Sequence, residues 1–271
     1  MDGKIKMCNR GFHACESPFD VFDYYTMIDS RFCEVEQDGN ISKWDRGTKI
    51  CSSKIKIKAE LKLADMINLG VEWLKEITSP EKIKTSIKDN SSGNNAQIGS
   101  SGDGAKIGSS GDGAQIGSSG YGAKIGSSGN NAKIGSSGYG AQIGSSGYGA
   151  QIGSSGYDAR IGSSGYGAQI GSSGYDAQIG SSGYGAKISS SGYGAKIDST
   201  GEDCVIMCAG INSVAKASKG SWVTLSEWSY SEEKQRYIPI CVKTEFVDGE
   251  KIKADTYYSL KGGVFVEWIN D

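Results

Sequence analysis

A nine-residue unit, Ala-x-Ile-Gly-Ser-Ser-Gly-x-x, repeats through the middle of this chain without an insertion. Its alanine recurs from Ala96 to Ala195, and its isoleucine follows two residues later, from Ile98 to Ile197. One such unit cannot bury an apolar face alone, so each unit must stack on its neighbours. Most of the 41 glycines keep fixed places in the period, which indicates an ordered array rather than a flexible linker. The predicted fold class is therefore all-β dominated, built around a β-solenoid.

Each unit contains a short strand and a corner. In Ala-x-Ile the alanine and isoleucine point into the interior, while the middle residue, Gln, Lys or Arg, faces solvent. Gly-Ser-Ser-Gly is expected to turn the corner, with glycine supplying dihedral angles that a side chain would forbid. The period leaves open whether two or three units complete one coil. Nine residues comfortably form one side of a flattened roll, which favours two.

The number of units per coil decides which candidate binding residues line up. Two units per coil align a corner ladder that starts at Asp103 and continues through Tyr121, Tyr139, Tyr157, Tyr175 and Tyr193. Three units per coil instead align a basic column of Lys106, Lys133, Arg160 and Lys187. Stacked like charges are unfavourable without an anionic partner, so that column would suit an anionic nucleotide.

The sequence divides into four regions: an α+β head (1–60), a capping helix (61–80), the solenoid (81–218) and a β-rich C-terminal domain (219–271). In the head, alternation of apolar and polar residues predicts strands at 33–37, 50–52 and 54–58. Residues 17–25 are predicted to form a short helix, with Ser17 as its N-cap and Pro18 at its first position.

A second helix is predicted over residues 61–77, just before the repeats. Its apolar residues recur near helical spacing, at Leu63, Met66, Ile67, Val71, Trp73 and Leu74. We expect it to cap the open end of the solenoid, because an uncovered coil presents a free strand edge. The tail is predicted to form strands at 222–225, 238–242, 251–253 and 264–268, with turns at 248–249 and 262–263.

Composition narrows the classes of partner and location. The chain has 29 Lys+Arg against 31 Asp+Glu, which gives no global reason to expect binding to nucleic acid or a membrane surface. No apolar run approaches the roughly 20 residues of a membrane helix, and the N-terminus lacks the apolar core of a secretory signal. Seven cysteines without a compact spacing are most simply reduced thiols, so we expect a cytoplasmic protein.

Metal and catalytic sites have weak support in the sequence. Every unit lacks the carboxylate that a calcium-binding β-roll needs, and the outward Gln and Lys residues do not form the threonine array of an ice-binding face. Cys8, His13, Cys15, Cys33 and Cys51 lack paired zinc knuckles, so buried strand cysteines are expected instead. His13 and Cys15 could be base and nucleophile, yet nothing supplies an orienting third group. We expect no metal, cofactor or catalytic residue.

One enzyme hypothesis rests on a short resemblance. Gly11–Cys15, followed by Ser17-Pro18 and Tyr24-Tyr25, resembles the strand-then-helix segment of ADP-ribosyltransferase-like domains. Glu34-Val-Glu36 resembles their paired-glutamate motif, which implies that one glutamate polarises the nicotinamide ribose. A degenerate ADP-ribosyltransferase-like head is therefore an alternative. Ordinary strand alternation with two solvent-facing carboxylates explains the same residues.

Head and tail together resemble a wider family. The residues that carry the resemblance are 8–21, 34–36 and 47–50 in the head and 219–227 and 247–258 in the tail. They are similar to uncharacterised proteins encoded by phages and prophages of Gram-positive bacteria, whose members place a variable run of nonapeptides between these two pieces. Those members begin earlier, with a further strand-rich segment, which implies a truncated or variant head here. The family implies no established catalytic residue.

The resulting expectation is a phage-derived, non-enzymatic binding protein in the cytoplasm of a bacterial host. Its rigid solenoid would engage a host protein through the tyrosine ladder and the Gln/Lys/Arg face, and so inhibit a defence system. Tyrosine and arginine are favoured anchors, and a rigid array loses little entropy on binding. The alternatives are a sponge that sequesters an anionic nucleotide on the basic column, and a self-assembling spike or filament. The oligomeric state is left open.

Overall fold

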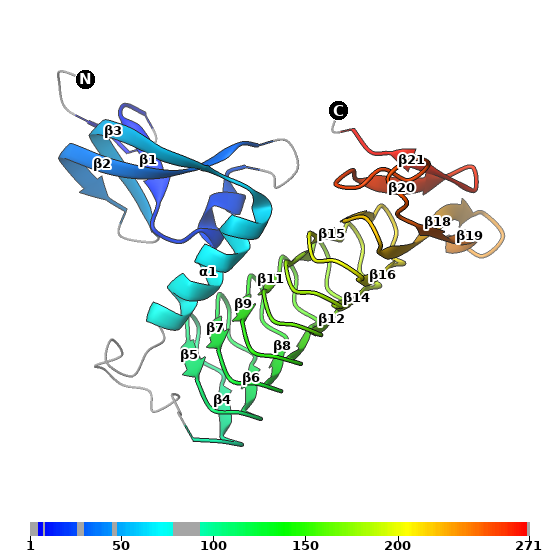
Figure 1. Ribbon diagram of the computed structural model, residues 1–271, viewed down its shortest axis with the longest axis horizontal. Coiled ribbons are helices and arrows are strands. Elements are labelled where there is room, and N and C mark those ends of the chain that lie inside the picture. The colour runs from blue at the N-terminus through cyan, green and yellow to red at the C-terminus, as the bar shows by residue number, and fades with distance from the viewer. Residues whose placement is uncertain (1–4, 8, 26–29, 45–47, 78–92, 270–271) are drawn as a thin grey trace.

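The computed structural model describes residues 5–7, 9–25, 30–44, 48–77 and 93–269 (Figure 1). It contains an N-terminal head, a helix, an elongated β-solenoid and two C-terminal hairpins. The helix, α1 (Leu63–Ile77), lies between the head and one side of the solenoid. The predicted fold class, all-β dominated with a β-solenoid, is confirmed.

Each nine-residue unit supplies one four-residue strand, and two units complete a coil. Strand pairing joins Ile98 to Ile116 and Ile107 to Ile125, so the structure confirms two units per coil. The strands form two parallel stacks, each extended by C-terminal strands into a nine-stranded sheet. The first stack is β4 (Gln97–Ser100), β6 (Gln115–Ser118), β8 (Lys133–Ser136), β10 (Gln151–Ser154), β12 (Gln169–Ser172), β14 (Lys187–Ser190) and β16 (Val205–Cys208). The second is β5 (Lys106–Ser109), β7 (Lys124–Ser127), β9 (Gln142–Ser145), β11 (Arg160–Ser163), β13 (Gln178–Ser181), β15 (Lys196–Ser199) and β17 (Val214–Ala217).

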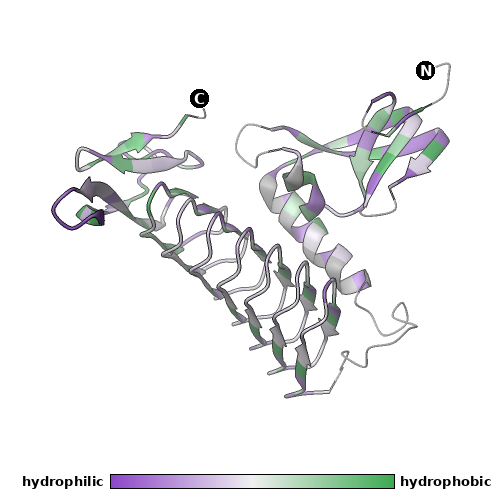
Figure 2. Ribbon diagram, turned by 180° about the vertical axis from the view of Figure 1, so that it is seen from behind, coloured by the Kyte–Doolittle hydropathy of each residue, from purple (hydrophilic) through white to green (hydrophobic). Residues whose placement is uncertain are grey.

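The interior is a thin layer between the two stacks, formed by columns of alanine, isoleucine and serine. The isoleucines from Ile107 to Ile206 are buried, and Figure 2 shows them as hydrophobic bands repeated along the solenoid. In the seventh coil, Cys204 takes the place of the alanine and Cys208 that of the inward serine. Both thiols are buried, so these cysteines act as small apolar side chains.

The corners differ from the expectation, because the glycines of Gly-Ser-Ser-Gly are not the residues with left-handed dihedral angles. The second glycine of the unit is required by space: a Cβ on Gly156 would lie 2.0 Å from the carbonyl oxygen of Gly138 in the preceding coil. The left-handed dihedral angle falls on the last residue of the unit, as at Gly140 (φ 65°), Asp158 (φ 52°) and Asn131 (φ 53°). Gly, Asp and Asn are the residues that tolerate this conformation, which explains why only they occupy the position.

The head is a three-stranded antiparallel sheet in the order β1-β3-β2. Its elements are β1 (Phe12–Cys15), the 3₁₀ helix η1 (Phe19–Asp23), β2 (Phe32–Lys43) and β3 (Lys49–Leu61). The predicted strands 33–37, 50–52 and 54–58 are confirmed, the last two as parts of β3. The predicted short helix is a single 3₁₀ segment whose N-cap residue is Pro18 rather than Ser17, although the Ser17 hydroxyl accepts a hydrogen bond from the Asp20 N–H at 3.2 Å.

Helix α1 forms where predicted, but it does not cap the end of the solenoid. It lies along the outer side of the second stack, against strands β5 to β13 (Figure 1). Its other side packs on the head, where Met66 is buried with Phe19, Phe22 and Phe32. An amphipathic stripe indicates that one face of a helix is buried, but not which element buries it. The predicted position of this helix, at the open end of the solenoid, was therefore wrong. The side chains of Leu63, Ile67, Val71 and Leu74 lie outside the described structure, as do Cys8 and residues 78–92.

Asp20 connects the head directly to the solenoid. Its Oδ1 accepts a hydrogen bond from Gln142 Nε2 at 2.6 Å, and its Oδ2 lies 3.7 Å from Lys124 Nζ. The Lys124 ammonium also lies over the ring of Trp73 in α1, 4.9 Å from the ring centroid. Polar groups from the head therefore reach the outward residues of β7 and β9.

The C-terminal hairpins extend the two stacks separately. β18 (Trp222–Ser231) continues the first stack beside β16 and pairs with β19 (Arg236–Phe246). β20 (Tyr258–Lys261) pairs with β17 of the second stack and with β21 (Val264–Glu267). The predicted turn at Gly262-Gly263 joins β20 to β21, with φ angles of 58° and 71°. The predicted strand at 251–253 does not form, and these residues lie in an irregular segment with bends that leads from β19 to β20.

The buried thiols give a first testable expectation. Burial raises the pKa of Cys208 to about 12, whereas Cys33 is exposed on β2. Because the thiolate is the reactive form, Cys208 should resist iodoacetamide at pH 8 in the folded protein while Cys33 is alkylated. Peptide mass spectrometry before and after unfolding in urea measures this difference. Alkylation of Cys208 at the rate of Cys33 without urea would contradict the buried placement.

Candidate binding surface

The two outer faces of the solenoid carry the same repeat but are covered differently. We call the outward side of β5 to β17 the covered face and the outward side of β4 to β16 the open face. On the covered face Gln142, which is hydrogen-bonded to Asp20 of the head, is 6% exposed, and Val214 is 2% exposed. At the matching position of the open face, Val205 is 45% exposed. The asymmetry arises from tertiary docking, since the strand sequences are equivalent.

The open face is a long, shallow groove with a volume of 1080 Å³. One column is formed by the first outward residues Gln97, Gln115, Lys133, Gln151, Gln169 and Lys187. The neighbouring column is formed by Gly99, Gly117, Gly135, Gly153, Gly171 and Ser189. A Cβ placed on Gly135 or Gly153 would meet nothing within 4 Å. The groove is therefore the space that these glycines leave beside the glutamine and lysine side chains.

Charge on the open face is sparse and of one sign. Among the outward positions of the open-face strands β4, β6, β8, β10, β12 and β14, Lys133 and Lys187 are the only charged side chains. They lie three coils apart, which is about 14 Å at the usual strand spacing. The glutamines between them offer both donors and acceptors of hydrogen bonds. Such a surface suits a partner that presents polar and acidic groups.

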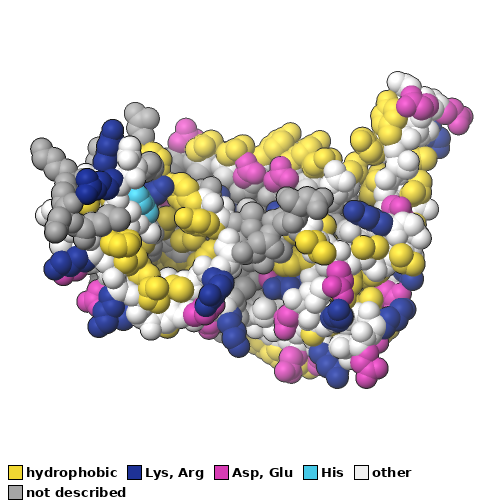
Figure 3. Space-filling view, turned by 90° about the horizontal axis from the view of Figure 1, so that it is seen from above, with side chains coloured by type: hydrophobic (Ala, Val, Ile, Leu, Met, Phe, Trp, Pro, Cys, Tyr) yellow, Lys and Arg dark blue, Asp and Glu magenta, His cyan; other side chains and the backbone are white. Residues whose placement is uncertain are grey.

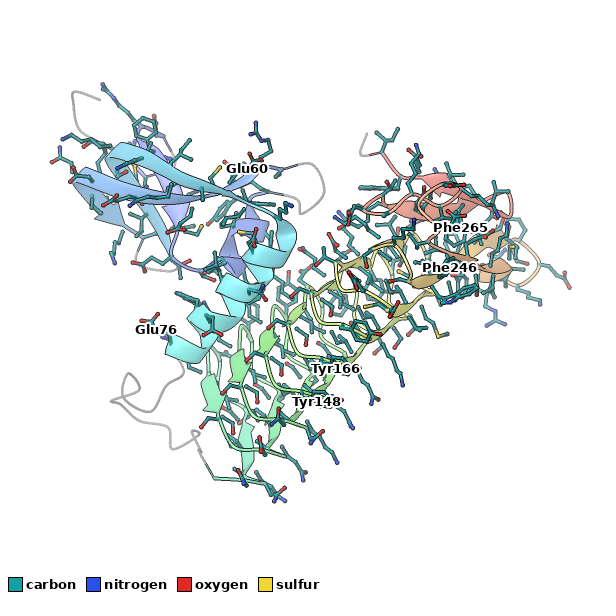
Figure 4. All side chains as sticks on the ribbon, viewed as in Figure 1. Glu60, Glu76, Tyr148, Tyr166, Phe246 and Phe265 are labelled. Carbon is teal, nitrogen blue, oxygen red and sulfur yellow. The ribbon has the colours of Figure 1, made fainter. Side chains whose placement is uncertain are left out.

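The open face ends in an apolar patch near the C-terminal hairpin. It is formed by Val205, Met207, Trp222 and Phe246, which are between 41% and 50% exposed. The rings of Trp222 and Phe246 lie 5.1 Å apart between centroids, on the paired strands β18 and β19. Figure 4 labels Phe246. Large exposed aromatic residues beside a groove are typical of protein-binding surfaces.

One edge of the solenoid carries the predicted tyrosine ladder. The rings of Tyr121, Tyr139, Tyr157, Tyr175 and Tyr193 stack in sequence, with centroid distances from 4.9 to 6.5 Å. Each ring is between 40% and 61% exposed. At the start of the ladder, the Asp103 carboxylate accepts a hydrogen bond from the Tyr121 N–H at 2.9 Å. The stacking that the two-unit coil implied is thus confirmed.

A second ladder on the opposite edge was missed. Tyr148, Tyr166 and Tyr184 stack with centroid distances of 4.9 and 5.1 Å, and Figure 4 labels the first two. It begins with Asn94, Asp112 and Asn130, whose side-chain oxygens accept backbone hydrogen bonds from the next coil. The signal was present in the sequence, because a coil of two units has two corners and the second lies nine residues from the first.

Acidic residues at the corners keep some ring hydroxyls protonated. A hydrogen bond to Asp158 raises the pKa of Tyr139, and a hydrogen bond to Asp203 raises that of Tyr184. The Tyr184 hydroxyl lies 2.5 Å from Asp203 Oδ2. At Tyr139 and Tyr184 the ladders therefore present neutral aromatic rings beside the open face.

The basic column does not form. Lys106 and Arg160 lie on β5 and β11 of the covered face, whereas Lys133 and Lys187 lie on β8 and β14 of the open face. The reason is the two-unit coil, which places residues 27 apart on opposite stacks. The column that would have held an anionic nucleotide is thus split between two faces.

The head carries a second concave surface, which we call the head groove, with a volume of 1710 Å³, between its sheet and α1. His13 and Cys15 both line it, as expected for residues two apart on a strand. Figure 3 shows hydrophobic side chains gathered over this part of the molecule. Cys51 is buried and Cys15 is half-buried, but Cys33 is exposed, so the expectation of buried strand cysteines was wrong for Cys33. Within the described residues, no cluster of His, Cys, Asp or Glu is placed to hold a metal ion.

The two glutamates of the transferase-like motif lie in different surroundings. Glu34 lines the head groove, whereas Glu36 forms an ion pair with Lys58 at 2.9 Å and does not line it. A register shift between Glu34 and Val35 interrupts the regular alternation of β2. The structure thus does not bring the two carboxylates together in the head groove.

Comparison with known proteins matches only the N-terminal part. Residues 1–69 match a family model described as a domain of unknown function, DUF7666, which spans the head and the first turns of α1. No curated protein and no solved structure matches the chain. In the part of the chain that the structure describes, no helix has the length and apolar character needed to cross a membrane.

Proposed function

We propose that this protein is a non-enzymatic binding protein whose solenoid holds a partner protein on its open face. The observation that carries the proposal is the difference between the two faces, since equivalent strands are covered on one side and exposed on the other. The groove, its two lysines and the apolar patch form one continuous surface, bordered by the tyrosine ladders. Backbone hydrogen bonds along the stacked coils keep this surface rigid, so little entropy is lost on binding.

The identity of the partner follows from the sequence resemblance alone. We propose that the protein is of phage origin, acts in the bacterial cytoplasm and binds a host protein to inhibit a defence system. The match of residues 1–69 to an uncharacterised domain fits such a family and assigns no activity. A nucleotide sponge has less support, because its four basic residues lie on two faces.

Capture from a bacterial lysate tests the proposal with a matched pair of variants. The full chain should retain a host protein at one-to-one stoichiometry, and the double variant Gly135→Arg/Gly153→Arg should reduce capture at least tenfold. Both glycines face open space, so the added side chains fill the groove without disturbing the coil. Tyr230→Arg, on the exposed C-terminal hairpin, is the control and should capture as well as the unmodified chain.

If the double arginine variant captures the partner as well as the unmodified chain does, the partner binds elsewhere and the open face is not its site. Circular dichroism of each variant shows whether the solenoid is intact before the comparison is made.

A further inference from the structure

We infer that the open face accepts an acidic amphipathic α-helix of about fifteen residues, lying along the solenoid axis. The inference deepens the proposed function and rests on it, because it names the kind of partner element that the open face binds. It starts from the covered face, where the same strand sequence already holds a helix, α1.

The dimensions of that intramolecular interface fit a helix running along the stack. Helix α1 lies across the five strands β5, β7, β9, β11 and β13. Four strand spacings of about 4.8 Å give about 19 Å, and the 15 residues of α1 at 1.5 Å each give about 22 Å. The open face from β4 to β14 has five spacings, about 24 Å, which accommodates a helix of the same length.

The surface chemistry of the two faces is also matched. Both present the sequence x-Ile-Gly-Ser, and the outward glycine leaves room for another backbone to approach. Gly144 and Gly162 are buried on the covered face, whereas Gly135 and Gly153 are exposed on the open face. The glutamine column is no obstacle to burial, because Gln142 is buried on the covered face with its amide donating to Asp20.

Charge sets the character of the helix. On the covered face, Lys124 lies against the carboxylate of Asp20, so a basic outward residue is met by an acidic one. Lys133 and Lys187 of the open face lie about 14 Å apart, which corresponds to about ten residues along a helix. An acidic residue at one end of the partner helix would face Lys133 and another about ten residues along would face Lys187. An apolar residue at the far end would extend toward Trp222 in the apolar patch, two strands beyond Lys187.

The probe is a peptide of residues 62–77, which contains the sequence of α1, because α1 packs on the equivalent strands of the covered face. It carries Asp65, Glu72 and Glu76 against Lys62 and Lys75. Fluorescence anisotropy of the labelled peptide with the full chain should show saturable binding of one peptide per protein. Gly135→Leu/Gly153→Leu should weaken this binding at least tenfold by filling the groove. Lys133→Glu/Lys187→Glu should weaken it similarly by repelling the peptide, and Tyr230→Ser should leave it unchanged.

Two results would overturn the inference. One is the absence of saturable binding. The other is binding that neither the double leucine variant nor the double glutamate variant weakens, which would mean that the peptide displaces α1 from the covered face. If the lysate partner is lost in the arginine variant but the peptide does not bind, the helical partner is wrong and the open face remains the site. If the lysate partner is also undiminished in that variant, both proposals fail together.

Discussion

Replacing Gly156 with alanine should strongly destabilise the solenoid. The new Cβ would lie 2.0 Å from the carbonyl oxygen of Gly138, a backbone atom that cannot move without separating two coils. Separation would break backbone hydrogen bonds such as that from Ser155 N to Ser136 O. We expect the free energy of unfolding to fall by more than about 4 kcal/mol, which is exceptional for one methyl group. Urea titration followed by circular dichroism measures the loss.

Gly153→Ala is the matched control, three residues away on the same coil. A Cβ there meets nothing within 4 Å, and Gly153 is absent from the positive-φ positions. This substitution should change the free energy of unfolding by less than about 1 kcal/mol, mainly through the unfolded chain. Similar losses in both variants would show that glycine is needed for its backbone freedom rather than for the close approach of the coils.

Replacing Lys216 with methionine should destabilise the C-terminal end of the solenoid by about 3–5 kcal/mol. Lys216 Nζ lies 2.7 Å from Oδ2 of Asp198, and the Tyr257 hydroxyl donates to the same oxygen at 3.0 Å. Asp198 is only 1% exposed, so loss of the lysine leaves a buried carboxylate without its cation. The double variant Asp198→Asn/Lys216→Met removes both charges and should recover much of the stability.

The loss should depend on pH in a defined direction. Burial raises the pKa of Asp198 above its ordinary value of 3.8, against the opposing effect of Lys216, so removing Lys216 raises it further. The folded variant then holds a proton that the unfolded chain releases, so its stability falls as the pH rises above 3.8. Urea titrations at pH 4.5 and pH 8 should show the smaller loss at pH 4.5. A loss that is equal at both pH values would mean that the carboxylate is not the cause.

The architecture of the repeats was predictable because one residue type dominates each position. An isoleucine every nine residues fixes the interior column, and the unit length favours a coil of two strands over a coil of three. The corner ladders follow from the same arithmetic, so even the missed Tyr148, Tyr166 and Tyr184 could have been found by following the second corner.

The open face could not be predicted, because the sequence makes both faces equivalent. The difference depends on where α1 and the C-terminal segment dock, which is decided by contacts between residues far apart in the chain. Asp20 meets Gln142 across 122 positions, and Tyr257 meets Asp198 across 59. Asp198 occupies a position that is glycine in most units, and only its buried partners explain the departure.

The two-strand coil also limits how such a chain can change length. Removing a single nonapeptide would shift every following strand to the opposite stack, so β20 and β21 would dock on the side away from α1. Removing two adjacent nonapeptides would shorten the rod by one coil and leave head and tail on the same side. Viable length variants should therefore differ by multiples of eighteen residues, with the gene gaining or losing repeats in pairs.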